Sequence, residues 1–384
     1  MFYQLPPVGN PVSLTRQADG VADFTDLTDP WSPRFYQSGT AALASALLLA
    51  RHQKAVAGPE VILPAYACPD LVSAAVYAGV KPVLVDFVED RPWMDLTALE
   101  QRVSRQTVAI VAVNFLGIQE RIEQLGRLAE QAGILLVEDS AQAFPVMQTN
   151  GQGSDLVILS FGRGKPLSLL GGGAVLYRNP EYARLLPERR PVDSRPLASI
   201  SFYLKAALYN AMISPRIYWL PASLPFLHLG ETRFHSLPGI DAIAPDRLQI
   251  LSANLKGYAS HCSRAQTQLR KVYDEFSQFS GRITGLPAAC ETRRDRPLLR
   301  YPFLVDSKER NRLVDGLSRR GLGASRMYPA ILPNIDGVAG HIDAPGEYPR
   351  ARSFAEQLMT LPMHSRVRQK DIAAMQEVVR NTLI

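Results

Sequence analysis

Apolar residues along the chain follow two spacings, one typical of strands and one typical of helices. Continuous aliphatic and β-branched runs predict buried strands over 61–63, 82–86, 107–113, 134–139 and 155–160. Apolar residues three and four positions apart predict helices within 36–50 and over 70–78, 96–103 and 122–132. Strands and helices that alternate in this way predict an α/β fold, with a mostly parallel sheet covered by helices on both faces.

The last third of the chain has a different pattern. It predicts a long amphipathic helix over 248–279, a strand over 299–305 and helices over 309–320 and 369–383. These elements indicate a smaller α+β domain. We therefore predict a large domain over 1–240, which begins with an irregular arm over 1–35, and a small domain over 241–384.

Residues 197–229 form an apolar and aromatic segment inside the predicted large domain. Lys205, Pro215, Arg216 and Pro221 interrupt it, so it lacks the ~20 uninterrupted apolar residues of a membrane-spanning helix. Three interpretations stay open for this segment: an arm at a dimer interface, a lid over the site, or a peripheral membrane contact.

Composition narrows the function classes. The 384 residues are 46% hydrophobic, carry a formal net charge of +6 and include three dispersed cysteines, Cys68, Cys262 and Cys290. We predict a cytoplasmic protein that binds anionic small molecules, with no metal site and no nucleic-acid partner. The chain lacks the G-x-G-x-x-G, Walker and H-E-x-x-H motifs, which argues against a nicotinamide enzyme, an NTPase and a zinc peptidase.

Two charged residues stand beside predicted strands. Lys165 lies between two apolar runs, where burial would lower the pKa of its ammonium group and favour a Schiff-base nucleophile; a solvated loop lysine is the alternative. Asp139 ends a strand, and a carboxylate there is costly unless it meets a cation or strong donors. It could pair with a protonated ring nitrogen, with Gln142 contacting the same ligand, or cap a helix at 140–143.

A phosphate site is predicted where Ser38, Gly39 and Thr40 precede an Ala/Leu-rich helix. The free N–H groups of a helix N-terminus attract anions, and glycine lets a phosphate approach the backbone. An ordinary helix cap by Ser38 or Thr40 explains the pattern equally well.

Taken together, the chain from Tyr36 onwards resembles the DegT/StrS-type sugar aminotransferase family. These enzymes use pyridoxal 5'-phosphate (PLP) on the aspartate-aminotransferase fold, fold type I. The similarity is carried by SGTAAL (38–43), VILPAY (61–66), AGVKPVLVD (78–86), VEDSAQA (137–143), SFGRGK (160–165), GGGAV (171–175), MYP (327–329) and LPMH (361–364).

The resemblance implies a role for each matching residue. Lys165 would hold PLP and move a proton, Asp139 would pair with the pyridinium nitrogen, and Gln142 would contact the ring hydroxyl. Ser160 would hold the phosphate together with Gly39 and Thr40. Tyr328 would lie near the substrate entrance.

Three positions depart from the family pattern. Cys68 stands where the family usually stacks an aromatic residue on the ring, so Tyr66, an aliphatic contact or a sulfur contact would cover the ring. Gly171 replaces an acidic residue. Asp241 lies where relatives send an asparagine to the phosphate of the neighbouring subunit, and an aspartate there would repel phosphate.

The resemblance also implies a reaction and an assembly. Lysine rather than histidine at position 165 favours transamination over dehydration. An amino acid, most plausibly glutamate, would donate its amino group to a keto-sugar, typically nucleotide-linked, for surface polysaccharide or secondary-metabolite biosynthesis in a homodimeric enzyme. The alternatives are another PLP-dependent reaction on a lipid-linked or acyl acceptor at a membrane, and a non-catalytic PLP-binding regulator.

Overall fold

A seven-stranded mixed sheet forms the centre of the molecule. The computed structural model describes residues 3–144, 153–192, 196–224, 231–258, 269–270, 273, 276, 283–286, 290, 297–342 and 346–383. The strand order is β1-β7-β6-β5-β4-β2-β3. The strands are β1 (Ser32–Tyr36), β2 (Glu60–Pro64), β3 (Lys81–Val85), β4 (Thr107–Val113), β5 (Leu135–Asp139), β6 (Leu156–Ser160) and β7 (Gly173–Tyr177).

The strands of this sheet run in one direction except β7, which is reversed. Strands β3, β2, β4, β5 and β6 are parallel, whereas β7 pairs antiparallel with both β6 and β1. Asp139 is level with Val113 of β4 and with Ile158 of β6. The carboxyl ends of β4, β5 and β6 therefore meet at one edge, and the predicted mostly parallel α/β sheet is confirmed.

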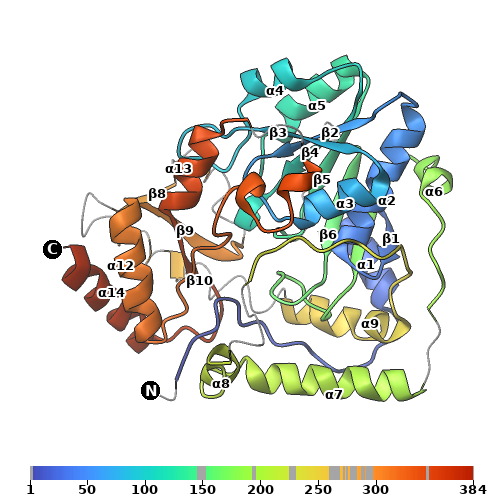
Figure 1. Cartoon of the computed structure of the whole chain (residues 1–384). Helices are drawn as coiled ribbons and strands as arrows, with labels where there is room; N and C mark the ends of the chain where they lie inside the picture. Colours follow the sequence, from blue (N-terminus) through green and yellow to red (C-terminus); the bar gives the residue numbers. More distant parts are fainter. Residues whose placement is uncertain are drawn as a thin grey trace.

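Alternate side chains of the buried strands pack into two hydrophobic cores, one on each face of this sheet. Val111 and Val113 pack with helices α2 (Gly39–Gln53) and α3 (Asp70–Ala78). Ile110 and Ala112 pack with α4 (Leu96–Arg102) and α5 (Ile122–Ala132). Because helices cover both faces, the strands can be apolar at every position (Figure 1).

Most predicted helix boundaries in this part agree with the structure. Helices α3 and α5 span the predicted residues, and each ends at a glycine in the left-handed conformation, Gly79 (φ 65°) and Gly133 (φ 61°). Glycine adopts this conformation without the steric penalty of a Cβ atom. The sequence therefore marks these helix ends by residue type.

The predicted irregular arm over 1–35 is wrong in part, because it contains α1 (Gly20–Thr28) and most of β1. Phe24 and Phe35 of these elements are buried with Phe161. The segment after β7 holds α6 (Tyr182–Leu185), α7 (Pro196–Met212) and α8 (Trp219–Ala222). Helix α7 lies along the lower edge of the molecule (Figure 1).

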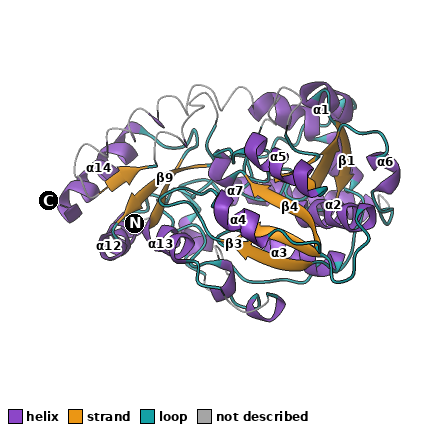
Figure 2. Ribbon diagram, turned by 90° about the horizontal axis from the view of Figure 1, so that it is seen from above, coloured by secondary structure: helices purple, strands orange, loops and turns teal. Residues whose placement is uncertain are grey.

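The smaller sheet has the order β10-β9-β8 and lies at one end of the molecule with α12 and α14 (Figure 2). Its strands are β8 (Ile283–Gly285), β9 (Arg300–Val305) and β10 (Leu358–Pro362), and its helices are α12 (Ser307–Arg319), α13 (Pro349–Gln357) and α14 (Gln369–Leu383). Short 3-10 turns are η1 (Phe115–Gly117), η4 (Leu332–Asn334) and η5 (Ala339–His341). The predicted strand over 299–305 and both predicted C-terminal helices are present.

Residues that follow the predicted domain boundary at 240 still pack against the larger sheet. Helix α9 (Pro245–Gln249) is followed by a turn at Ile250 and by helical residues 251–258. Ile243, Leu251 and Leu255 pack with Phe24 against this sheet. Part of the helix predicted over 248–279 lies outside the described residues, and the division at residue 240 stays a prediction.

Candidate active site

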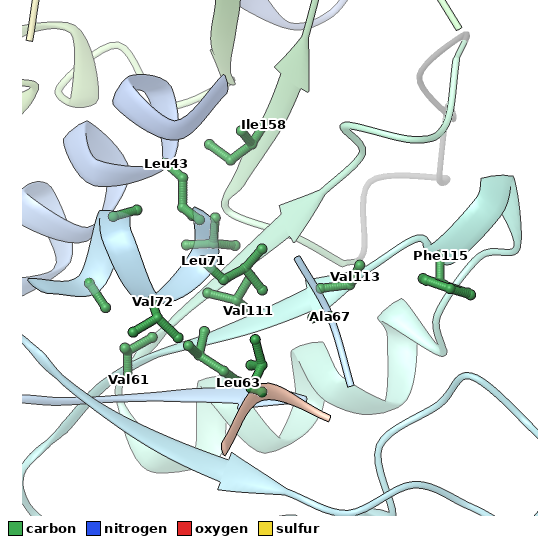
Figure 3. Packing of buried hydrophobic residues seen from close by; sticks show 14 of the residues in the cluster. Leu43, Val61, Leu63, Ala67, Leu71, Val72, Val111, Val113, Phe115 and Ile158 are labelled. Carbon is green, nitrogen blue, oxygen red and sulfur yellow. The ribbon is translucent and has the colours of Figure 1, made fainter. Parts of the chain in front are cut away.

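A pocket opens where β4, β5 and β6 end. Most of the predicted site residues line it, namely Gly39, Thr40, Cys68, Asp139, Gln142, Ser160 and Lys165. Leu43, Leu71, Val113 and Ile158 form its apolar walls (Figure 3). Residues that are up to 126 positions apart in the chain therefore share one cavity, because parallel strands place their carboxyl ends on the same side of the sheet.

Asp139 is a buried carboxylate at the end of β5. Its Oδ1 accepts a hydrogen bond from the backbone N–H of Ala141 at 2.9 Å. Burial raises the pKa of Asp139, while this hydrogen bond and the charge of Lys165 oppose the rise. A protonated ring nitrogen in the pocket would supply the positive charge and the donor that stabilise the carboxylate.

Lys165 lies in the turn that follows β6, and its side chain is half-buried. Its backbone N–H donates to the carbonyl of Gly162 at 3.3 Å. The Lys165 charge acts on both Asp139 and the thiol of Cys68. Lys165 thus lines the pocket within electrostatic range of the strand-end carboxylate, which fits a lysine that anchors a ring-containing cofactor.

The predicted phosphate site consists of the N-terminus of α2 and Ser160. The Ser38 hydroxyl accepts from the N–H of Ala41 at 3.1 Å, so the helix-cap interpretation holds for Ser38. A Cβ atom at Gly39 would lie 2.7 Å from the Cβ of Ser160, so only glycine allows this approach. The first N–H groups of α2 and the Ser160 hydroxyl therefore adjoin one another, an arrangement that suits a phosphate.

Gln142 bridges the pocket and a buried tyrosine. Its Oε1 accepts from the backbone N–H of Leu116 at 2.9 Å, and its Nε2 donates to the Tyr328 hydroxyl at 2.8 Å. Tyr328 is itself buried behind Gln142 and next to Cys68, so it reaches the pocket through these two residues.

Tyr66 does not line this pocket, so the structure gives no support to the alternative in which Tyr66 stacks on the ring. The side chain is 1% exposed and packs edge-on against Phe87, Phe115 and Phe354. Its hydroxyl donates to the backbone carbonyl of Tyr328 at 3.1 Å. Cys68 lines the pocket instead, and burial raises the pKa of its thiol to about 12, so it offers a neutral sulfur surface.

Asp241 is paired within the chain. Its carboxylate accepts from Nε of Arg190 at 2.5 Å, and its backbone N–H donates to the side chain of Gln37. Arg190 therefore compensates the negative charge of Asp241, the charge that was expected to repel a phosphate. Gly171 has φ 142°, and a side chain there would meet the guanidinium of Arg247.

A buried polar network behind Asp139 was not predicted. Glu138 accepts from Asn114 at 2.6 Å and from the hydroxyls of Ser140 and Ser154 at 3.2 and 2.9 Å. These bonds fix the turn that follows β5 and hence the direction of Asp139 and Gln142. The sequence does contain a signal for this network, because Glu138 is a second acidic residue inside an apolar strand. A buried carboxylate requires several hydrogen-bond donors, so polar partners near Glu138 could have been expected.

Comparison with known proteins places this geometry in a family. The family model described as the DegT/DnrJ/EryC1/StrS aminotransferase family matches residues 35–189. The erythromycin biosynthesis sensory transduction protein EryC1 of Saccharopolyspora erythraea is 34% identical over 312 residues, which cover 80% of this chain and 74% of that protein. The chain belongs to the DegT/DnrJ/EryC1/StrS aminotransferase family.

Other members of the family agree with the assignment. The dTDP-3-amino-3,4,6-trideoxy-alpha-D-glucose transaminase of Streptomyces venezuelae is 27% identical over 80% of this chain and 72% of its own length. Among solved structures, Helicobacter pylori PseC superimposes with a TM-score of 0.71 at 15% identity, covering 97% of this chain and 99% of that chain. The fold is thus fold type I, and the protein is an aminotransferase.

Proposed function

We propose that this aminotransferase uses PLP to move an amino group from an amino acid, most simply glutamate, to a nucleotide-linked keto-sugar. One observation supports the proposal most strongly. A single pocket brings together Lys165, Asp139 and the close contact between Gly39 and Ser160. Named relatives are a dTDP-amino-sugar transaminase and a GDP-perosamine synthase. Solved neighbours include a Streptococcus pneumoniae protein in PLP and PMP forms.

The chain's own residues supply the parts of this reaction that the protein must provide. PLP, when bound, supplies an electron-accepting ring that stabilises negative charge at the donor carbon. Asp139 would orient the ring and keep its nitrogen protonated. Lys165 would hold the cofactor and move the proton at the reacting carbon, while Ser160 and the N-terminus of α2 would bind the phosphate.

The direct test is optical. Purified protein supplied with PLP should absorb near the visible edge, and L-glutamate should shift that band. Lys165→Ala should lose the covalently attached cofactor and all transamination, whereas Lys308→Ala on the exposed side of α12 should keep both. A protein that takes up no PLP would contradict the proposal. Mass spectrometry of nucleotide keto-sugars incubated with glutamate would then identify the acceptor.

We further propose that the enzyme is a cytoplasmic homodimer, as the family resemblance implies. Light scattering should give the mass of two chains at micromolar concentration. None of the helices in the described parts of the chain is long and apolar enough to cross a bilayer. The single-chain mass at every concentration would contradict the dimer.

Helix α7 favours a peripheral contact with an anionic membrane. Leu197, Ile200, Leu204 and Leu208 repeat at helical spacing and are 81%, 64%, 68% and 57% exposed. The charged residues within 196–224 are Lys205 and Arg216, and the segment has no acidic residue. An exposed apolar helix face on a segment whose own charged residues are all cations complements the headgroups of anionic lipids.

Vesicle flotation tests this contact. The protein should float with phosphatidylglycerol vesicles and not with phosphatidylcholine vesicles, and Leu204→Gln with Leu208→Gln should abolish flotation. Val76→Gln, at a 38% exposed position on α3, is the control. If the double variant instead changes the oligomer mass and vesicles have no effect, the α7 face is an interface between two chains.

A further inference from the structure

Residues 161–172 form the loop between β6 and β7 that carries Lys165, here called the Lys165 loop. The two ends of this loop meet at Phe161, whose backbone carbonyl accepts hydrogen bonds from the N–H groups of Leu169 and Gly171 at 2.8 and 3.0 Å. Since these bonds close the loop, the position of Lys165 depends on how firmly the last residues of the loop are held.

The last residues of the Lys165 loop have unusual backbone conformations. Leu170 has φ 60°, in the left-handed region where a Cβ atom crowds the backbone. Gly171 and Gly172 follow with φ 142° and 100°, which glycine adopts without that penalty. A leucine persists in the left-handed conformation only where neighbouring contacts fix it. The contacts around Leu170 therefore determine the shape of the loop.

Arg247 of α9 contacts the loop at this strained point. Its Nη1 donates a hydrogen bond to the carbonyl of Leu169, immediately before Leu170. Its guanidinium lies beside Gly171, where a Cβ atom would be 3.0 Å from the Cζ atom of Arg247. The same Cζ atom is 4.9 Å from the ring centroid of Phe202 on α7. Arg247 thus joins α7 to the end of the Lys165 loop.

Helix α7 also contacts the loop directly. Tyr209 lies two helical turns after Phe202, and its hydroxyl hydrogen-bonds to the backbone of Gly164, the residue before Lys165. Both rings pack against the core that contains Leu169. The backbone on each side of Lys165 is therefore tied to α7, on one side by Tyr209 and on the other through the arginine of α9.

We propose that Arg247 is a positioning residue for Lys165. This inference rests on the proposed function, in which Lys165 holds the cofactor. Arg247 is not among the described residues that line the pocket, so it acts through the loop and not on a ligand. A charged guanidinium with several donors in one plane holds a backbone carbonyl more firmly than a neutral amide does. Without it, Leu170 can leave the left-handed conformation, and Lys165 shifts relative to Asp139.

Hydrogen exchange in the cofactor-free protein tests the loop itself. The amides of Leu169 and Gly171 should exchange about 10-fold faster in Arg247→Gln, as expected for the loss of a hydrogen bond from a charged donor. Arg247→Lys keeps the charge and should restore part of the protection. Mass spectrometry of peptic peptides, fragmented to single residues, measures both rates.

The reactivity of Lys165 gives a second measurement. PLP is added to the protein, the bond to lysine is reduced with borohydride, and the modified peptide is quantified over time. Attachment at Lys165 should be about 10-fold slower in Arg247→Gln, and kcat of the loaded enzyme should fall by a similar factor. The KM values of glutamate and of the keto-sugar should stay the same, because no substrate contact is lost.

Arg310 of α12 provides the matched control. It is also buried, and its Nη1 donates to the backbone carbonyl of Ala355 at 3.0 Å, away from the Lys165 loop. Arg310→Gln should lose a similar amount of stability but keep the wild-type exchange of the loop and the wild-type rate of PLP attachment. If Arg247→Gln does not fold, Arg247→Lys should show the same changes at smaller size.

Three results would overturn the inference. One is wild-type exchange at Leu169 and Gly171 in Arg247→Gln, and another is equally faster exchange of the loop in Arg310→Gln, which would indicate a general loss of stability. The third is faster exchange with unchanged PLP attachment and kcat, which would show that the loop does not position Lys165. If the wild-type protein itself takes up no PLP, the proposed function fails, whatever the variants do.

Discussion

The Nε2 of Gln142 donates a hydrogen bond to the hydroxyl of Tyr328 across 2.8 Å. This bond connects the turn after β5 of the larger sheet with the loop between α12 and η4. Gln142 lines the pocket, so Tyr328 helps to hold in place a side chain that a substrate can contact. This polar contact between buried side chains is thus part of the junction between the two sheets beside the site.

Tyr328→Phe should slow the donor half-reaction about fivefold and leave PLP uptake unchanged. Burial raises the pKa of Tyr328 well above its ordinary value, so the residue acts as a neutral hydroxyl at all working pH values. Its removal leaves the Gln142 amide without its acceptor, at a cost of about 1 kcal/mol. Stopped-flow absorbance with glutamate measures the rate.

Tyr273→Phe is the matched control for this prediction. Tyr273 is also buried, and its hydroxyl donates to the carbonyl of Pro362 at 3.0 Å, but it belongs to the core of the smaller sheet. It should lose a similar amount of stability without a change in rate. Equal rates in the two variants would show that Tyr328 is only a packing residue.

The sequence predicts those features of the site that depend on strand ends. Asp139 and Ser160 end apolar runs, and strands β5 and β6 are neighbours, so their meeting follows from the alternation of strands and helices. The approach of Gly39 to Ser160 depends on the same alternation, because α2 follows β1 and packs on the sheet against β6 and β7.

Contacts between distant segments could not be predicted from local pattern. Tyr66 has an aromatic ring that could stack on a cofactor, but this ring packs in the core against Phe87, Phe115 and Phe354. This outcome depends on tertiary packing that periodicity does not encode.

Asp139→Asn should weaken PLP binding and flatten the pH dependence of stability in cofactor-free protein. Burial raises the folded-state pKa of Asp139 above its unfolded value, so the folded state binds more protons between the two values. Stability therefore falls as pH rises through this window, and an asparagine removes that contribution. Urea unfolding at several pH values between 4 and 8 measures it.

The same variant should raise the Kd for PLP about 10- to 100-fold, because a hydrogen bond to a charged group contributes about 1.5–3 kcal/mol. Fluorescence titration with PLP measures this constant. A more steeply pH-dependent Asp139→Asn protein would show that the carboxylate is ionised and stabilising without its ligand.

Gly39→Ala should lower both stability and PLP affinity. The new Cβ would lie 2.7 Å from Cβ of Ser160 and 2.9 Å from its Oγ, so α2 or β6 must shift. Overpacking of this kind costs about 1–3 kcal/mol. Thermal unfolding and PLP titration are the measurements.

Gly340→Ala is the control for that clash, because a Cβ at Gly340 meets nothing within 4 Å. It should leave the unfolding temperature and the PLP titration unchanged. If Gly39→Ala is as stable as the control and binds PLP normally, the approach of α2 to Ser160 is not required for the cofactor.

His364 should make the protein less stable in mild acid. The ring is buried after β10, its Nδ1 accepts from the N–H of Arg366 at 3.3 Å, and its Nε2 therefore donates to the carbonyl of Pro6 at 2.9 Å. This arrangement requires the neutral ring, and burial lowers the pKa of His364 from 6.5 to about 4. The unfolded chain binds the extra proton first as pH falls, so stability is lost between these values.

The loss should reach roughly 3 kcal/mol at the lower end of that window, the equivalent of the shift in pKa. His364→Gln keeps a neutral donor and acceptor, so its stability should change less between pH 7 and pH 5, as measured by urea unfolding. His52→Gln, at an exposed position on α2, should keep the wild-type pH dependence. A wild-type slope in His364→Gln would show that another group binds the proton, because glutamine cannot titrate.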